Sequence, residues 1–250
     1  MQLRNDKERK ENNLFKRNLF LKLFQKNIKN NNNFSFTKYG DGELKCIFDF
    51  IEGEKNCDKH PYSKELGESL KESLVNNSKR NNVFIGDWTG WNNDSYSLFR
   101  DVFLHERSIM PNFVYYEMLL NHDEINEELI NLYKDIKESK RRKIFIGSNK
   151  LESVINLLNV DKAIYTPSEN SYSEYEKIEE QALEEAKDGC VFILSFGMPS
   201  KILIDSCLSR NEKISMLDFG SSFDALFLDK TREGQVNKND LKEACKNLLT

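Results

Sequence analysis

Short apolar runs alternate with longer segments of helical periodicity from residue 34 onward. Runs of four to eight apolar or β-branched residues between turn formers are typical of strands, whereas apolar spacings of three and four indicate amphipathic helices. We therefore expect strands at Phe34–Tyr39, Asn82–Gly86, Lys143–Gly147, Ala163–Thr166, Val191–Phe196 and Ile214–Phe219. We expect helices at Glu43–Glu52, Ser63–Ser78, Ser95–Glu106, Glu124–Ser139, Lys150–Leu158, Ser173–Lys187, Ser200–Leu208 and Lys238–Leu249. This alternation predicts an α/β fold, with a Rossmann-like and mainly parallel sheet flanked by helices.

The first 33 residues have a different pattern and are expected to form an N-terminal amphipathic helical extension, ahead of one domain at 34–250. Within residues 14–26, leucines and phenylalanines alternate with lysines and an arginine, which gives a helix with a basic polar face. Two interpretations remain open. The helix associates with a membrane surface or a partner, or it packs on the domain and leaves its lysines in water.

Composition limits the class of protein. A chain of 250 residues with 38% hydrophobic residues can bury the core of one large domain. The net charge of −4 gives no general attraction to nucleic acid, so we expect no such partner. Five scattered cysteines without a CxxC pair argue against disulfides and structural zinc. The N-terminal sequence has no signal-peptide pattern, and no apolar run approaches the ~20 residues of a membrane span, so we expect a cytoplasmic protein.

The most informative motif follows the first predicted strand. Gly40 and Gly42 flank Asp41, and Glu43 starts the next helical pattern. Two carboxylates at a strand-to-helix turn, with glycines that let a ligand approach the backbone, suit a divalent metal and a diphosphate. The alternative is a tight Asp-Gly turn that places Glu43 in the first helical turn, where the helix dipole favours acids.

Small and polar residues also follow the other predicted strands. Ligands of parallel α/β sheets bind beyond the carboxyl ends of the strands, so these positions are candidates for one pocket. They include Trp88, Trp91, Ser148, Asn149, Asn170, Tyr172, Gly197, Gly220, Ser221 and Asp224. Turn chemistry alone explains part of this enrichment.

The segment Lys38-Tyr39-Gly40-Asp41-Gly42-Glu43 resembles the Arg-(Phe/Tyr)-Gly-Asp-Gly-Glu motif that opens the GT-D-fold glycosyltransferases, long catalogued as a bacterial domain of unknown function. Further similarities follow in the family's order, and together they span about residues 34–228. They are Gly147-Ser148-Asn149, Pro167 to Tyr172, Leu194 to Gly197 and Leu217 to Ser221. Lys38 replaces the usual arginine, which keeps the charge but loses the bidentate fork. Ser221 stands where some members carry histidine, so no role of that histidine transfers to this chain.

The resemblance implies a metal-dependent glycosyltransferase. Its donor would be a nucleotide-diphosphate sugar, with a UDP-sugar expected, and its acceptor a glycan, glycolipid or glycoprotein. Asp41 and Glu43 would hold Mn²⁺ or Mg²⁺; as extended residues at i and i+2, they would reach one ion from the same side. Together with Asp224 they are the expected catalytic residues. The expected donor-binding residues are Lys38, Tyr39, Gly40, Gly42, Ser148, Asn149, Asn170, Tyr172, Gly197, Gly220 and Ser221.

Each further candidate has a structural alternative. Ser148 and Asn149 suit phosphate or ribose, but equally a helix cap, and Asp224 equally suits the start of a short helix. Asn170 and Tyr172 fit a base or ribose, or else an Asx turn. The two tryptophans, Trp88 and Trp91, suit sugar stacking or rim packing, and the three histidines are expected at the surface or in packing.

The whole protein also has alternatives. The same acids suit a metal-dependent phosphoesterase that hydrolyses nucleotide sugars, and a non-catalytic nucleotide-binding scaffold would show binding without turnover. The basic start of the chain would suit work at the inner face of the cell membrane, where lipid-linked glycans are built.

Overall fold

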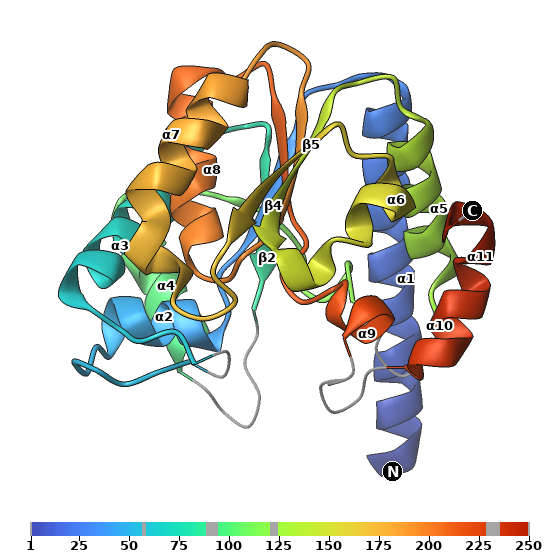
Figure 1. Ribbon diagram of the computed structural model, residues 1–250. Helices are drawn as coiled ribbons and strands as arrows, with labels where there is room; N and C mark the ends of the chain where they lie inside the picture. Colours follow the sequence, from blue (N-terminus) through green and yellow to red (C-terminus); the bar gives the residue numbers. More distant parts are fainter. Residues whose placement is uncertain (1, 57–58, 89–94, 121–124, 229–235, 250) are drawn as a thin grey trace.

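Seven parallel strands form one sheet in the part of the chain that the computed structural model describes, which is residues 2–56, 59–88, 95–120, 125–228 and 236–249 (Figure 1). The strands are β1 (Ser35–Lys38), β2 (Val83–Asp87), β3 (Asn112–Tyr115), β4 (Lys143–Ser148), β5 (Lys162–Thr166), β6 (Val191–Ser195) and β7 (Ser215–Asp218). Their order is β3-β2-β1-β7-β6-β4-β5, and every pair is parallel. The α/β class and the mainly parallel sheet predicted from the sequence are confirmed.

Helices cover both faces of the sheet (Figure 1). One layer contains α1 (Gln2–Lys29), α5 (Glu127–Glu138), α6 (Val154–Leu158), α10 (Lys238–Ala244) and α11 (Lys246–Leu249). The other contains α2 (Asp41–Phe48), α3 (Lys64–Lys79), α4 (Tyr96–His105), α7 (Tyr175–Glu185) and α8 (Pro199–Arg210). The short helix α9 (Asp224–Phe227) and the 3-10 turns η1 (Asn149–Leu151) and η2 (Ser171–Glu174) complete the described elements.

The central strands are apolar at consecutive positions because both faces of the sheet are covered. Val191 and Ile193 of β6 pack into the core on the α1 side, whereas Phe192 and Leu194 pack into the core on the α8 side. All four side chains are completely buried. Each central strand therefore contributes side chains to both cores, one on each face of the sheet. Polar residues occur where the strands end.

Helix α1 packs on the domain over its second half. Leu21, Phe24 and Ile28 are buried in the same core as the sheet residues. Phe15 and Leu19 are exposed at 68% and 54%. No helix among the described residues is long and apolar enough to cross a bilayer. Of the two interpretations of this segment, packing on the domain describes its buried face, which includes Arg17, Leu21 and Phe24. Membrane association, expected for residues 14–26, stays a prediction and now concerns only the exposed face with Phe15 and Leu19.

Arg141 ties together the loops at the amino ends of the strands. Its guanidinium donates to the carbonyl oxygens of Gly189 (2.6 Å) and Asn32 (3.0 Å). It also donates to Asn33 Oδ1 (2.8 Å) and Ser215 Oγ (3.0 Å). One buried side chain thus joins the segments that enter β1, β6 and β7.

Several elements differ from the sequence prediction. The helices expected at Lys150–Leu158 and Lys238–Leu249 are each divided in two, and the short helix α9 was not among the predicted helices. Strand β3 was not predicted; it is a four-residue edge strand with only Val114 fully buried, so its pattern is short. Helix α2 begins at Asp41, two residues earlier than expected, with Gly40 as its N-cap. The earlier start of α2 changes the geometry of the acidic motif.

The sheet extends from β1 in two directions. Strands β2 and β3 lie on one side of β1, and strands β7, β6, β4 and β5 lie on its other side. In open α/β sheets, a ligand crevice forms at such a reversal of strand order, beyond the carboxyl ends. The reversal lies between β1 and β7, which carry the acidic motif and the Gly220 turn.

Candidate active site

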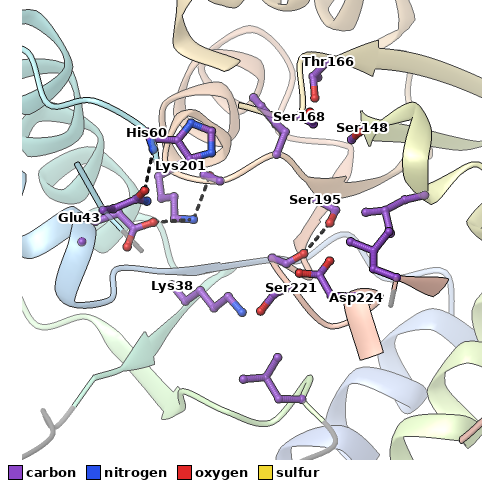
Figure 2. A pocket seen from close by; sticks show the side chains of 18 of the residues that line it. Lys38, Glu43, His60, Ser148, Thr166, Ser168, Ser195, Lys201, Ser221 and Asp224 are labelled. Carbon is purple, nitrogen blue, oxygen red and sulfur yellow. Dashed lines mark hydrogen bonds and ion pairs between the residues drawn. The ribbon is translucent and has the colours of Figure 1, made fainter. Parts of the chain in front are cut away.

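A cavity of about 440 Å³ lies at the carboxyl ends of the strands (Figure 2). It is lined from β1 and α2 on one side and from the ends of β4 and β5 on the other, with the ends of β6 and β7 between them. The sequence-predicted residues that line it are Lys38, Asp41, Gly42, Glu43, Trp88, Ser148, Gly197, Gly220, Ser221 and Asp224. Strand ends far apart in sequence therefore meet in one pocket, as the parallel sheet requires.

One side of the cavity, here called the charged wall, consists of Lys38, Asp41, Glu43 and Lys201. Glu43 is the third residue of α2, and its Oε2 accepts from the Gly40 N–H at 3.0 Å. Asp41 is the first residue of the same helix and is exposed at the rim. The acids therefore stand in a helical turn, as in the Asp-Gly alternative.

The expected extended geometry of residues 41–43 is wrong. Positions i and i+2 of a helix do not face each other, so Asp41 and Glu43 do not point the same way by backbone geometry alone. A metal ion bound by both acids would have to lie between Asp41 at the cavity rim and Glu43 in the charged wall. The Gly40 N–H donates to Glu43 within this turn.

Lys201 of α8 is the centre of the charged wall. Its Nζ lies 3.0 Å from Glu43 Oε1 and 2.9 Å from Asp218 Oδ2, and it donates to the Gly197 carbonyl at 3.2 Å. Its side chain is only 3% exposed, and Asp218 is completely buried. Burial alone would lower the pKa of Lys201, but attraction to Asp218 and Glu43 outweighs it and raises that pKa above the ordinary lysine value. The two carboxylates therefore favour the protonated form of Lys201.

Lys38 brings a second ammonium to the floor of the cavity. It is 7% exposed, its Nζ donates to the Phe219 carbonyl at 3.4 Å, and it lies 5.6 Å from the centre of the Tyr116 ring. A Cβ at Gly220 would come within 2.7 Å of this nitrogen, and Gly220 has a φ of +54°. The positive φ favours glycine at 220, and the missing side chain leaves room for the end of Lys38.

The opposite side, here called the hydroxyl wall, consists of Ser148, Thr166, Ser168 and Ser195 (Figure 2). Ser148 Oγ accepts from the Lys150 N–H at 3.3 Å, which caps η1 as the structural alternative for this residue stated. Thr166 Oγ1 donates to the Pro167 carbonyl at 3.3 Å, and Ser168 Oγ accepts from Lys150 Nζ at 3.2 Å. Ser148 and Thr166 are thus held by their own turns, whereas Ser168 bonds to a side chain from a different loop.

Ser195, Ser221 and Asp224 connect the two walls. Ser195 Oγ donates to the Gly220 carbonyl at 2.5 Å, which joins the ends of β6 and β7. Asp224 starts α9, and its N–H donates to the Ser221 carbonyl at 3.1 Å. Ser221 and Asp224 line the cavity together with Lys38 (Figure 2). Asp224 therefore starts a short helix and lines the cavity at the same time.

Five predicted site residues do not line the cavity. Tyr39 is completely buried, and its hydroxyl bonds to Ser73 and Asn77, because its position in the pleat turns it into the core. Gly40 caps α2, and a Cβ there would come within 2.3 Å of the Tyr116 hydroxyl. The remaining three are Asn149, which is exposed, Asn170, which adopts a φ of +50° before η2, and Tyr172, which packs against Tyr175.

The cavity also contains residues that the sequence did not single out. Lys201, Asn56 and Tyr116 line it, and so does His60, which is 6% exposed and was expected at the surface or in packing. A Cβ at Gly197 would come within 2.9 Å of His60 Nε2, so the glycine admits the imidazole. Trp88 packs edge-on against Tyr116 at 5.0 Å, whereas Trp91 lies outside the described residues.

A divalent cation fits the chemistry of the charged wall only with help from a ligand. No group of three His, Cys, Asp or Glu side chains among the described residues could hold a metal ion alone. Mg²⁺ and similar hard ions commonly use one or two carboxylates together with substrate phosphates. Glu43 is held at both oxygens yet retains further lone pairs, so it can serve as a fixed oxygen ligand beside Asp41.

Comparison with known proteins identifies the fold. No family model and no curated protein matches the sequence. A solved domain of unknown function 1792, reported to have a distinct glycosyltransferase fold, matches with a TM-score of 0.56 and 16% identity, over 90% of this chain and 88% of that chain. A selenomethionine form of such a domain gives the same values. A structure described as a new glycosyltransferase from Streptococcus sanguinis matches with a TM-score of 0.51 and 17% identity, over 75% of both chains. The chain has the fold of these domains, which confirms the sequence resemblance at the level of fold.

Proposed function

We propose that this protein is a glycosyltransferase that moves a sugar from a nucleotide-diphosphate donor, a UDP-sugar, to a glycan, glycolipid or glycoprotein acceptor. The observation that carries the proposal is the cavity at the β1–β7 reversal, with carboxylates and lysines on one wall and hydroxyls on the other. The solved neighbours add an analogy at the level of fold, which by itself does not establish function.

The charge of the cavity supports a divalent cation as part of the donor complex. Carboxylates outnumber lysines among the described residues that line it: Asp41, Glu43, Glu117 and Asp224 against Lys38, Lys150 and Lys201. A diphosphate would meet net repulsion there without a cation. Asp41 and Glu43 would hold Mn²⁺ or Mg²⁺, which supplies a Lewis acid that stabilises the charge of the departing nucleotide.

The chain's own residues would then divide the work. Lys38 places a buried ammonium at the cavity floor, where it adds positive charge beside a diphosphate. The hydroxyl wall offers donors and acceptors that suit ribose or sugar hydroxyls. Asp224 lines the cavity next to Ser221 and is the proposed carboxylate that receives the acceptor's proton.

The acceptor side of the proposal includes the N-terminal helix. Phe15 and Leu19 are exposed on α1 beside the exposed Lys16. An exposed apolar and basic helix face suits peripheral binding to an anionic membrane. We therefore propose action in the cytoplasm, at the inner face of the membrane, on acceptors built there.

The first experiment measures UDP release from a panel of UDP-sugars with Mn²⁺, with and without glycan acceptors, and thermal unfolding with UDP and Mn²⁺. We expect acceptor-dependent UDP release and a higher unfolding temperature when both ligands are present, because ligands that bind the native state stabilise it. The variant Asp41→Asn/Glu43→Gln should lose the Mn²⁺-dependent part of both signals.

The outcomes separate the alternatives. Donor hydrolysis that no acceptor stimulates would indicate a phosphoesterase, and binding without turnover would indicate a scaffold. Mn²⁺-dependent UDP binding that survives the double substitution would refute the metal role of Asp41 and Glu43.

A further inference from the structure

Lys201 is enclosed by oxygen atoms from several parts of the site. Besides Glu43, Asp218 and the Gly197 carbonyl, its Nζ lies 3.1 Å from Ser200 Oγ. Glu43 belongs to α2, Asp218 to the end of β7 and Gly197 to the turn after β6, whereas Ser200 precedes Lys201 in α8. The ammonium therefore links three strand ends at the charged wall of the cavity, and Figure 2 shows it beside Glu43.

The position of this ammonium decides the position of Glu43. Oε1 of Glu43 is bound by Lys201 and Oε2 by the Gly40 N–H, so the carboxylate is fixed at both oxygens. Residues that hydrogen-bond a metal-ligating carboxylate set its orientation, and their loss commonly costs about 10- to 100-fold in metal affinity or activity. Lys201 has this relation to Glu43, and Asp218 holds Lys201 in place from the opposite side.

A second ion pair of α8 shows what a purely structural contact looks like. Asp205, one turn after Lys201, pairs with Arg80 at 2.7 Å, and both side chains are 14% exposed. This pair joins α8 to the end of α3, and neither residue lines the cavity. The two ion pairs thus share one helix, but only the Lys201 pair reaches the cavity.

We propose that Lys201 is a positioning residue that orients the Glu43 carboxylate for the divalent cation of the donor complex. This inference rests on the proposed function. Lys201 does not itself meet the cation; it fixes one of the cation's ligands and balances the buried charge of Asp218. This role predicts that loss of the Lys201 ammonium weakens metal-dependent nucleotide binding more than metal-independent nucleotide binding.

The test titrates Mn²⁺ into the full chain at saturating UDP, and separately titrates UDP in the presence of EDTA. In Lys201→Met we expect Mn²⁺ affinity to fall about 10- to 100-fold, while metal-free UDP affinity, which the net negative charge of the lining already keeps low, falls by a much smaller factor. Asp205→Asn, on the same helix, is the matched control and should leave both affinities unchanged. An unchanged Mn²⁺ affinity in Lys201→Met would overturn the proposal.

Two further variants exclude a general effect on folding. Glu43→Gln/Lys201→Met should bind Mn²⁺ no worse than Glu43→Gln alone, because residues that act through one another are not additive. Additive losses would show that Lys201 does not act through Glu43. Lys201→Gln/Asp218→Asn removes both buried charges, so it avoids an unpaired Asp218 and should show the same weakened Mn²⁺ binding if Lys201→Met fails to fold. If Lys201→Gln/Asp218→Asn bound Mn²⁺ and UDP as tightly as the unchanged protein, the positioning role of Lys201 would also be refuted.

Failure of the proposed function looks different. A wild-type protein without Mn²⁺-dependent UDP binding would remove both the donor proposal and the role of Lys201. A wild-type protein with such binding, together with an unaffected Lys201→Met, would remove only the role of Lys201.

Discussion

The charged wall and the hydroxyl wall face the same cavity but are built differently. In the charged wall, Glu43 and Lys201 are bound to groups from other strand ends, at distances of 2.9 to 3.2 Å for the lysine. In the hydroxyl wall, Ser148 and Thr166 bond to backbone groups one or two residues away. The Lys201 ion pairs are therefore fixed by the tertiary structure, whereas the hydroxyls of Ser148 and Thr166 are fixed by their own turns. Ser168 and Ser195 of the same wall bond to more distant groups, Lys150 and the Gly220 carbonyl.

This difference separates two tasks. Fixed charges suit the stabilisation of a departing anion, because they need no reorganisation during the reaction. Hydroxyls that depend only on their own turn can exchange partners at small cost, which suits recognition of a sugar or ribose. We therefore expect substitutions in the charged wall to change turnover, and substitutions in the hydroxyl wall to change mainly substrate affinity.

The largest effect is expected for Glu43→Gln. The amide keeps the size of the side chain but loses the charge that pairs with Lys201, so kcat/KM for sugar transfer should fall at least ~100-fold, or about 2.7 kcal/mol. Asp49→Asn, at the other end of α2, is a matched control, since Asp49 accepts only from the exposed Tyr96 hydroxyl among its described contacts. Equal kcat/KM losses in both variants would contradict a special role of the charged wall.

An intermediate effect is expected for Gly197→Ala, where the two walls meet. Gly197 has a φ of +75°, and a Cβ there would lie 2.9 Å from His60 Nε2. We expect a loss of about 1–3 kcal/mol in the free energy of unfolding, measured by urea denaturation.

Gly189→Ala is the control for that backbone strain. Gly189 has a φ of +82° and open space around its Cβ position. The difference between the two alanine variants therefore measures the contact with His60, and equal losses would show that the imidazole moves away freely.

The smallest effect is expected for Thr166→Val in the hydroxyl wall. Valine keeps the branched shape but removes the hydroxyl, and one hydrogen bond contributes about 0.5–1.5 kcal/mol. KM for the donor or the acceptor should rise about 2- to 10-fold, with kcat within about twofold. A fall in kcat at unchanged KM would place this hydroxyl at the reacting atoms and end the division between the walls.

Much of this arrangement could be predicted from the sequence, because buried parallel strands have a clear apolar pattern. The six predicted strands agree with the observed ones to within one or two residues, and residues that follow each of these six strands line one cavity. Strand β3 escaped because four residues at a sheet edge give little pattern, although Phe113, Val114 and Tyr115 form an aromatic and β-branched run after Pro111.

The residues that the sequence did not reveal depend on long-range geometry. Lys201 follows Pro199 and Ser200 in an ordinary helix start, and nothing nearby in the sequence shows that Asp218 and Glu43 converge on it. Tyr39 is adjacent to Lys38, yet the pleat sends it to the opposite side, into the core. The backbone at 41–43 was mistaken for extended because helix α2 begins directly at Asp41.

Arg141 has a consequence for how the molecule can move and change. Its guanidinium bonds to the loops before β1, β6 and β7, at the amino ends of the strands and away from the cavity. These bonds hold the amino-end loops together, so we expect any opening that admits a bulky acceptor to occur in the loops at the carboxyl ends of the strands. Loop grafts aimed at a new specificity therefore belong beside the cavity, whereas insertions near Asn32, Gly189 or Ser215 would break the hydrogen bonds of Arg141 that join β1, β6 and β7.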